Sequence, residues 1–365
     1  MATVTQEQVI EALSRVIEPE LHKDLITLNM VKDIAVTDGD VRFTITLTTP
    51  ACPLRNEIET EAAAAVRQIP GVENVTVHFD SRVPGDARLI GKLDVGIRNV
   101  LAVASGKGGV GKSTVATNLA LSLALEGASV GLLDADVYGP NIPLMMGVHE
   151  KPRAVRGKIL PLTGHGVKLM SIGFLVEPEQ PLIWRGPLLH TTIRQFLQDV
   201  DWGDLDYLVV DLPPGTGDAS LSLSQSLDIS GVVIVTTPQQ VAISDVIRSV
   251  KMFEQLKAPV LGVVENMSYF IAPDTGKRYD IFGHGGGKTM AEEAGVPFLG
   301  EIPLEPVVRE SGDGGAPVVV RDPESAAAKA IRAIARTVAA NLSVQNLSRP
   351  PFDPHAPDPS LRVLQ

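Results

Sequence analysis

The chain has 365 residues, of which 44% are hydrophobic and 21% are charged, and its formal net charge at pH 7 is −11. This length and composition are typical of a globular protein with two or three domains. The acidic balance argues against general binding to nucleic acids or to anionic membranes. The sequence has no apolar run of about 18 residues to span a membrane, and its start lacks the pattern of a signal peptide.

Cysteine occurs once, as Cys52, and the seven histidines are scattered along the chain. An internal disulfide is therefore impossible, and a zinc site with several cysteine ligands is excluded. A chain with this cysteine usage is expected to work in a reducing cytoplasm.

Residues 1–80 are predicted to form a small α+β domain. Apolar residues at helical spacing indicate a first helix, and the pair Asp38-Gly39 indicates a hairpin turn between two strands. The expected elements are helices over residues 6–16 and 53–69 and strands over residues 30–36, 41–48 and 71–79. Residues 81–98, which contain Pro84-Gly85 and two further glycines, are expected to be a linker.

Residues 99–342 show short apolar runs that alternate with helical stretches, which predicts an α/β domain. Continuous apolar strands are typical of a mostly parallel sheet covered by helices on both faces. The expected strands lie at residues 100–104, 130–134, 168–172, 207–211, 232–236 and 260–265. A last helix is expected over residues 324–342, and the Pro-rich segment 343–365 is expected to be a disordered tail.

The segment SGKGGVGKST follows the first of these strands and matches the pattern G-x-x-x-x-G-K-[ST]. Backbone N–H groups of such a loop cradle phosphate oxygens, and the dipole of the following helix favours the anion. The strand–loop–helix context disfavours a chance glycine loop. The residues expected to contact the nucleotide ATP are Gly106, Lys107, Gly108, Gly109, Val110, Gly111, Lys112, Ser113, Thr114, Gly215 and Asn266.

Carboxylates follow two other strands, at Asp134-Ala135-Asp136 and at Asp211. Side chains at the carboxyl ends of parallel strands project into the ligand crevice. Asp211 and the Ser113 hydroxyl are therefore expected to hold Mg²⁺, and Asp136 is expected to position the attacking water. Each aspartate also has the simpler interpretation of a helix N-cap. The Gly215 N–H is expected to bond the γ-phosphate and to relax after hydrolysis.

Three further positions have two interpretations each. Lys107 is either a solvated basic residue or a charge that reaches the phosphates of a second subunit. Asn266 is either a reader of the adenine edge or a turn residue. The glycines of residues 283–287, with His284 among them, form either an anion loop or a flexible connection. The predicted catalytic residues are Lys107, Lys112, Asp136 and Asp211.

Cys52 precedes a predicted helix that begins with Pro53, and Arg55 is near in sequence. A thiol at a helix N-terminus has a lowered pKa and is reactive, which makes Cys52 a candidate functional thiol. The alternative is an inert, buried cysteine.

Several motifs together resemble one family. GKGGVGKST with its additional Lys107 resembles the deviant Walker A motif of the ParA/MinD/nitrogenase-iron-protein class of P-loop ATPases. Within that class, DADVYGPNIP, DLPPGTGD, ENMSYF, IFGHGGG and GEIPLEP closely resemble the Mrp (ApbC-like) iron–sulfur cluster carriers. This resemblance covers about residues 99–340. The first domain, with TTPACP, is similar to the small domain of metal–sulfur cluster assembly proteins.

The resemblance implies a slow, Mg²⁺-dependent ATPase that works as a homodimer and delivers clusters to apoproteins, with assembly scaffolds as further partners. It implies that Lys107 acts in trans and that Lys112 is the P-loop lysine. Asp136 and Asp211 match the aspartates of switch I and switch II, and Asn266 matches the adenine-contacting position. Neither nucleic acid nor a membrane is an expected partner.

The chain departs from this family in one respect. Most cluster-carrying members have a Cys-x-x-Cys pair shortly after ENMSYF, whereas residues 271–276 here read IAPDTG. A [4Fe–4S] cluster normally takes four thiolates, and each subunit offers one. Three explanations stay open: carriage through Cys52 with external thiols, an assembly ATPase whose partner holds the cluster, or another use of the same switch. An ATP-switched scaffold and a ParA/MinD-like regulator are the alternative functions; the Pro-rich terminus and the net charge disfavour the regulator.

Overall fold

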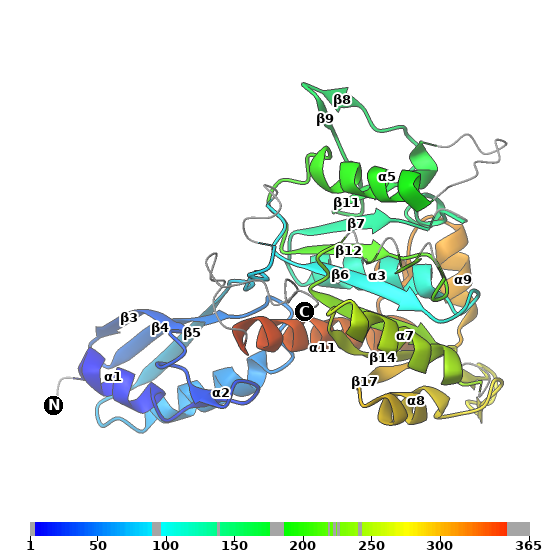
Figure 1. The fold of residues 1–365 in the computed structure, drawn as a ribbon. Coiled ribbons are helices and arrows are strands. Elements are labelled where there is room, and N and C mark those ends of the chain that lie inside the picture. The colour runs from blue at the N-terminus through cyan, green and yellow to red at the C-terminus, as the bar shows by residue number, and fades with distance from the viewer. Residues whose placement is uncertain are drawn as a thin grey trace, which may run out of the picture.

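The computed structural model describes residues 4–89, 96–136, 139–175, 186–217, 220–221, 224, 227–239 and 243–348. Two parts lie side by side, a small N-terminal domain and a larger α/β domain (Figure 1). Each has its own hydrophobic core.

The small domain is a three-stranded sheet with two helices packed on it. Strand β4 (Asp40–Leu47) lies in the centre, antiparallel to β3 (Val31–Thr37) and parallel to β5 (Asn74–Ser81). Helices α1 (Gln6–Leu13) and α2 (Arg55–Arg67) pack against each other and against the sheet. Two strands of two residues each, β1 (Ile17–Glu18) and β2 (Lys23–Asp24), pair with each other in antiparallel orientation.

The turn between β3 and β4 forms where the sequence predicts it. Asp38 and Gly39 have φ values of 47° and 90°, the left-handed geometry that two-residue hairpin loops require. The hairpin of this domain can therefore be predicted from its turn residues and from the alternation of apolar and polar residues in its strands.

The large domain is built on an eight-stranded sheet that is parallel except at one edge, where β10 is antiparallel to β11. Its strand order is β10 (Leu162–Gly164), β11 (Val167–Ser171), β7 (Val130–Asp134), β12 (Tyr207–Asp211), β6 (Val100–Ser105), β13 (Gly231–Thr236), β14 (Val260–Asn266) and β17 (Phe298–Ile302). All residues of the four central strands are buried, which explains their uninterrupted apolar sequences.

Helices cover both faces of this sheet, as Figure 1 shows. Helices α7 (Ile243–Gln255) and α8 (Gly286–Ala294) lie on one face, and α3 (Lys112–Leu125) and α11 (Ala326–Ser348) lie on the other. The remaining elements are α4 (Ile142–Met145), α5 (Gly186–Gln198), α9 (Pro306–Asp313), α10 (Val318–Arg321), the 3₁₀ turn η1 (Ile172–Phe174) and the small strands β8 (Ala154–Val155), β9 (Lys158–Ile159), β15 (Phe270–Ile271) and β16 (Arg278–Tyr279). The predicted fold class is confirmed.

Two segments differ from the sequence prediction. The segment predicted as a linker packs on the large domain, with Val83, Leu89 and Ile97 in its core, and Asp86 is buried in an ion pair with Arg88. Residues 343–348, predicted as part of the tail, instead continue α11, because Leu342 and Ser343 are buried and hold the helix against the protein. The rest of the predicted tail, residues 349–365, lies outside the described residues, as do residues 90–95.

The small domain docks on the large one through residues 48–51. Ala51 belongs to the large domain's core, and the Tyr207 hydroxyl donates a buried hydrogen bond of 3.1 Å to Thr49 Oγ1. Ser343 Oγ donates to the Thr48 carbonyl at 3.2 Å. None of the helices in the described part of the chain has both the length and the apolar character that crossing a membrane requires.

Candidate nucleotide-binding site

The glycine-rich loop joins the end of β6 to the start of α3. Gly109 and Gly111 have φ values of 79° and 82°, a conformation that glycine adopts without steric cost. Asn266, at the end of β14, donates from its side-chain amide to the Val110 carbonyl at 2.9 Å. The loop is therefore fixed in shape, with the N-terminus of α3 directed at its centre.

Lys112 lies buried at the centre of this site. Its Nζ is 2.6 Å from Asp211 Oδ1, 3.3 Å from Ser113 Oγ and 3.5 Å from Asp136 Oδ2. Ser113 Oγ donates to the other Asp211 oxygen at 2.5 Å. The structure thus brings together four residues that the sequence predicts as catalytic or Mg²⁺-binding.

Burial controls the charge of the two innermost carboxylates. It raises the pKa of Asp211, and the Lys112 ammonium opposes that rise. Burial and the neighbouring Asp211 raise the pKa of Asp134 to about 8. Asp134 accepts hydrogen bonds from Ser171 Oγ and from the N–H groups of Asp136 and Ile142, so it holds the strand end in place and does not face the cavity.

A cavity of about 490 Å³ opens above the loop. The predicted residues that line it are Lys107, Gly108, Gly109, Gly111, Lys112, Ser113, Thr114, Asp136 and Asn266. Sequence reasoning missed the wall that α4 and α9 contribute, with Met145, Val308 and Arg309 among its residues. The motifs DADVYGPNIP and GEIPLEP lie next to these residues in the sequence and could have indicated the wall. The family resemblance was based on both motifs but gave no role to Met145, Val308 or Arg309.

Other predicted residues lie beneath or beside the cavity. Asp211 and Val110 are buried below it, and Gly106 packs so closely on Asp245 that a Cβ would lie 2.5 Å from it. The Gly215 N–H donates to the Ser105 carbonyl at 2.8 Å. Lys107 Nζ donates to Gln239 Oε1 at 3.0 Å. Both groups thus have internal partners that a phosphate would have to replace.

The oxygen donors below the loop suit Mg²⁺. Asp211 Oδ2 and Ser113 Oγ lie together, and hydroxyl and carboxylate oxygens are the protein ligands that this ion takes beside phosphate. The present partners of Asp211 are all cationic or proton-donating groups. A cation therefore fits this position.

Cys52 lies in the other domain, and its predicted low pKa is wrong. Helix α2 begins at Arg55, beyond the thiol, and the Arg55 guanidinium stacks over the Phe79 ring at 4.6 Å. Burial, with smaller contributions from Glu20 and Glu18, raises the Cys52 pKa to about 11; backbone N–H groups oppose this. The structure does not bring Cys52 to the nucleotide site.

Two family models match the chain. The model of the NUBPL iron-transfer P-loop NTPase family matches residues 96–339, and that of the iron–sulfur cluster assembly protein family matches residues 6–78. The two matches correspond to the two parts of the fold.

Similar proteins span nearly the whole chain. An iron-sulfur cluster carrier protein of Synechocystis is 52% identical over 351 residues, 94% of this chain and 99% of the relative. A protein of the same name from Deinococcus radiodurans is 50% identical, over 94% and 98%.

A solved structure is similar to much of the chain. The nucleotide-binding protein from Archaeoglobus fulgidus, in complex with ADP and with cobalt found in it, is 41% identical, with a TM-score of 0.56 over 63% of this chain and 90% of that one. The resemblance that the motifs predicted is confirmed, and the chain belongs to the NUBPL iron-transfer P-loop NTPase family, whose members include the Mrp-like iron–sulfur cluster carriers.

Proposed function

We propose that this chain is an iron–sulfur cluster carrier that binds ATP, hydrolyses it slowly with Mg²⁺ and delivers clusters to apoproteins in a reducing cytoplasm. The observation that carries the ATPase part is the contact of Ser113, Asp136 and Asp211 with one buried cation, Lys112, below the glycine loop. Sequence similarity to proteins named iron-sulfur cluster carriers supports the proposed delivery of clusters.

The side chains suggest how hydrolysis is achieved. The loop N–H groups bind phosphate oxygens, and Lys112 neutralises charge on the transferred group. Mg²⁺ held by Ser113 and Asp211 would add further positive charge at the phosphates. Asp136 faces the cavity at 3.5 Å from Lys112 and orients the attacking water.

Gly215 gives the site a switch. Its N–H now bonds to the Ser105 carbonyl. A γ-phosphate competes for this N–H, so the segment after Asp211 takes one position with ATP and another after hydrolysis.

Lys107 gives a reason for dimerisation. It lines the cavity, and its ammonium is bonded to Gln239 in the same chain. In a homodimer it would exchange this partner for the phosphates bound by the second subunit, as an arginine finger does.

Phosphate release tests the ATPase part. We expect slow, Mg²⁺-dependent turnover in the wild type, a loss of at least about 100-fold in Lys112→Ala, and nucleotide binding with slowed turnover in Asp136→Asn. Lys329→Ala, which removes an exposed lysine paired with Glu324, is the matched control and is expected to match the wild type. Equal rates in Lys112→Ala and the wild type would contradict enzymatic hydrolysis at this site.

A second candidate function has an observation in its favour. The chain has one cysteine, and the thiol pKa of about 11 makes it a weak ligand at neutral pH. An assembly ATPase whose partner protein holds the cluster needs no thiolate of its own.

Anaerobic reconstitution with iron and sulfide separates the two candidates. We expect visible charge-transfer absorption in the wild type, its loss in Cys52→Ser, and transfer to an apoprotein that takes a [4Fe–4S] cluster. Absence of absorption in both proteins would contradict direct carriage and favour the assembly ATPase.

A further inference from the structure

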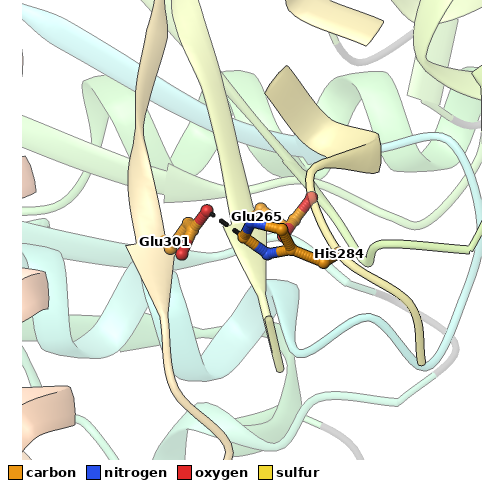
Figure 2. A group of neighbouring side chains, drawn as sticks. All are labelled: Glu265, His284 and Glu301. Atoms are coloured by element: carbon orange, nitrogen blue, oxygen red, sulfur yellow. Dashed lines mark ion pairs between the residues drawn. The ribbon is translucent and has the colours of Figure 1, made fainter. Parts of the chain in front are cut away.

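Three side chains of the types that bind metal ions lie close together beside the nucleotide site, and none of them lines its cavity. Glu265 is on β14, Glu301 is on β17, and His284 is in the loop before α8 (Figure 2). One ligand atom from each lies within 4.8 Å of the others. Strands β14 and β17 are parallel neighbours in which Glu265 and Glu301 are register partners, so the sheet itself sets the spacing of the carboxylates.

The two carboxylates place negative charge close together. Glu265 is fully buried, and its oxygens accept hydrogen bonds from Ser268 Oγ and from the Gly287 N–H. These neutral donors, with the N-terminal dipole of α8, supply partial positive charge and no full charge. Glu301 is 26% exposed and adds a second negative charge to the group. The arrangement therefore attracts a cation.

Arg278 supplies a cation at present. Its Nη2 lies 2.7 Å from His284 Nδ1 and 3.6 Å from Glu301 Oε2. Because a guanidinium has donors and no acceptor, the facing Nδ1 must carry a lone pair, which is the form of imidazole that binds metals. The arginine side chain is 42% exposed, stacks on Tyr269 and also pairs with Asp280, so it has partners outside this group.

We propose that Glu265, His284 and Glu301 form a site for a first-row divalent transition-metal ion, and that Arg278 moves aside when the ion binds. One imidazole with two carboxylates suits Zn²⁺, Fe²⁺ or Co²⁺ better than Mg²⁺, which prefers oxygen ligands alone. Tetrahedral ligands about 2.1 Å from a metal lie about 3.4 Å apart, so modest side-chain rotations close the site. The site shares no residue with the proposed Mg²⁺ position at Ser113 and Asp211, nor with Cys52.

Metal titration of the full chain, freed of metal and nucleotide, tests the proposal. Co²⁺ absorption and equilibrium dialysis with Zn²⁺ alone are expected to show one ion per chain at this site in the wild type and in Cys52→Ser. His284→Ala and Glu301→Gln are each expected to weaken binding by at least about tenfold. His149→Ala, which removes an exposed histidine elsewhere, is the matched control and is expected to bind like the wild type.

Arg278→Met tests whether Arg278 competes with the metal ion, because a purely structural role of Arg278 would not lead to tighter metal binding in this variant. Removal of the competing cation is expected to tighten metal binding severalfold, and weaker binding would overturn the displacement of Arg278. Full Co²⁺ and Zn²⁺ binding in both His284→Ala and Glu301→Gln, or binding lost in Cys52→Ser alone, would overturn the site. Circular dichroism verifies that each variant is folded. Should His284→Ala unfold, Glu301→Gln, at a partly exposed position, carries the test alone.

Discussion

Lys112 is paired with carboxylates of its own site. Its ammonium forms a buried ion pair with Asp211 and lies near Asp136, so an incoming phosphate must compete with two carboxylates for it. A divalent cation that takes over Asp211 and Ser113 removes the stronger competitor and releases Lys112 toward the phosphates. We therefore expect nucleotide and Mg²⁺ binding to be coupled through this one side chain.

Asp211→Asn tests this coupling. Because the substitution weakens the hold on Lys112 and removes a buried negative charge, the variant is expected to bind ATP without Mg²⁺ several times more tightly than the wild type. With Mg²⁺ it is expected to lose most hydrolysis, because a ligand of the ion is gone. Titration with a fluorescent ATP analogue, with and without EDTA, measures both effects. Glu11→Gln, which removes an exposed carboxylate paired with Arg15 in the small domain, is the control. Weaker ATP binding by Asp211→Asn than by the wild type in EDTA would refute the coupling.

Cys52 is expected to react slowly at neutral pH. Its pKa of about 11 is raised from the usual value, so the reactive thiolate is the minor form at pH 7 and grows about tenfold per pH unit below the pKa. Alkylation with iodoacetamide, followed by mass spectrometry, reports on this thiol alone because the chain has no other. Glu20→Gln removes a nearby negative charge and is expected to speed alkylation severalfold at pH 8, whereas Glu7→Gln serves as the unaffected control. A rate that levels off near pH 7 would show a low pKa instead.

Among the elements, β14 connects two functional regions through adjacent residues. Successive side chains of a strand point to opposite sides. Asn266 holds the glycine loop through the Val110 carbonyl, while Glu265 bonds to the first turn of α8. The end of this strand therefore fixes the nucleotide loop and the proposed metal group relative to each other.

Gly111→Ala tests the contact between β14 and the loop. A Cβ at this position would lie 2.2 Å from Asn266 Nδ2, and the φ of 82° strains any other residue. The variant is expected to bind ATP at least about tenfold more weakly and to lose about 1–2 kcal/mol of stability from the backbone alone. Gly276→Ala has a comparable φ of 66° with open space around it, so it is expected to show the strain without the loss of ATP binding. Isothermal titration and thermal unfolding compare the two, and equal ATP affinities would contradict the role given to the contact.

The elements predicted from sequence are those whose signal is local. The glycine loop follows from its motif, and the buried strands follow from uninterrupted Val and Leu. Strand β17 was missed because its sequence FLGEI includes a glycine at φ 141° and a glutamate. The α9 wall of the cavity and the raised pKa of Cys52 arise from segments far apart in sequence, so no local pattern predicts them. Site roles for Asn266, Lys107 and Gly215 stay predictions.

At the scale of the whole molecule, the small domain contacts the amino-terminal end of a central strand, whereas the nucleotide loop lies at the carboxyl ends of the strands. Thr49 bonds to Tyr207, the first residue of β12, and Asp211 is the last residue of that strand. Four steps of about 3.3 Å, or about 13 Å along the strand, therefore separate Tyr207 from Asp211, which belongs to the proposed Mg²⁺ site. Cys52 follows Thr49 by three residues, so it is close in sequence to the contact at the first residue of β12, whereas Asp211 is at the other end of that strand.

A double-mutant cycle on Tyr207 and Thr49 measures how strongly the docking contact holds the domains together. Tyr207→Phe removes the donor of this bond and is expected to cost about 1 kcal/mol of unfolding free energy. Thr49→Val removes the acceptor together with its bond from the Ala51 N–H, so it is expected to cost about 1–2 kcal/mol. The double variant is expected to cost less than the sum, by about 0.5–1.5 kcal/mol, because both single changes break the same bond. Ser343 also bonds to the small domain, at Thr48, and is expected to keep the two domains docked in all three variants. Urea unfolding then starts from the same docked native state in each variant. Strictly additive losses would mean that the hydroxyl pair contributes no coupling, and that the Ser343 bond and the apolar packing of Ala51 hold the small domain on the sheet without it.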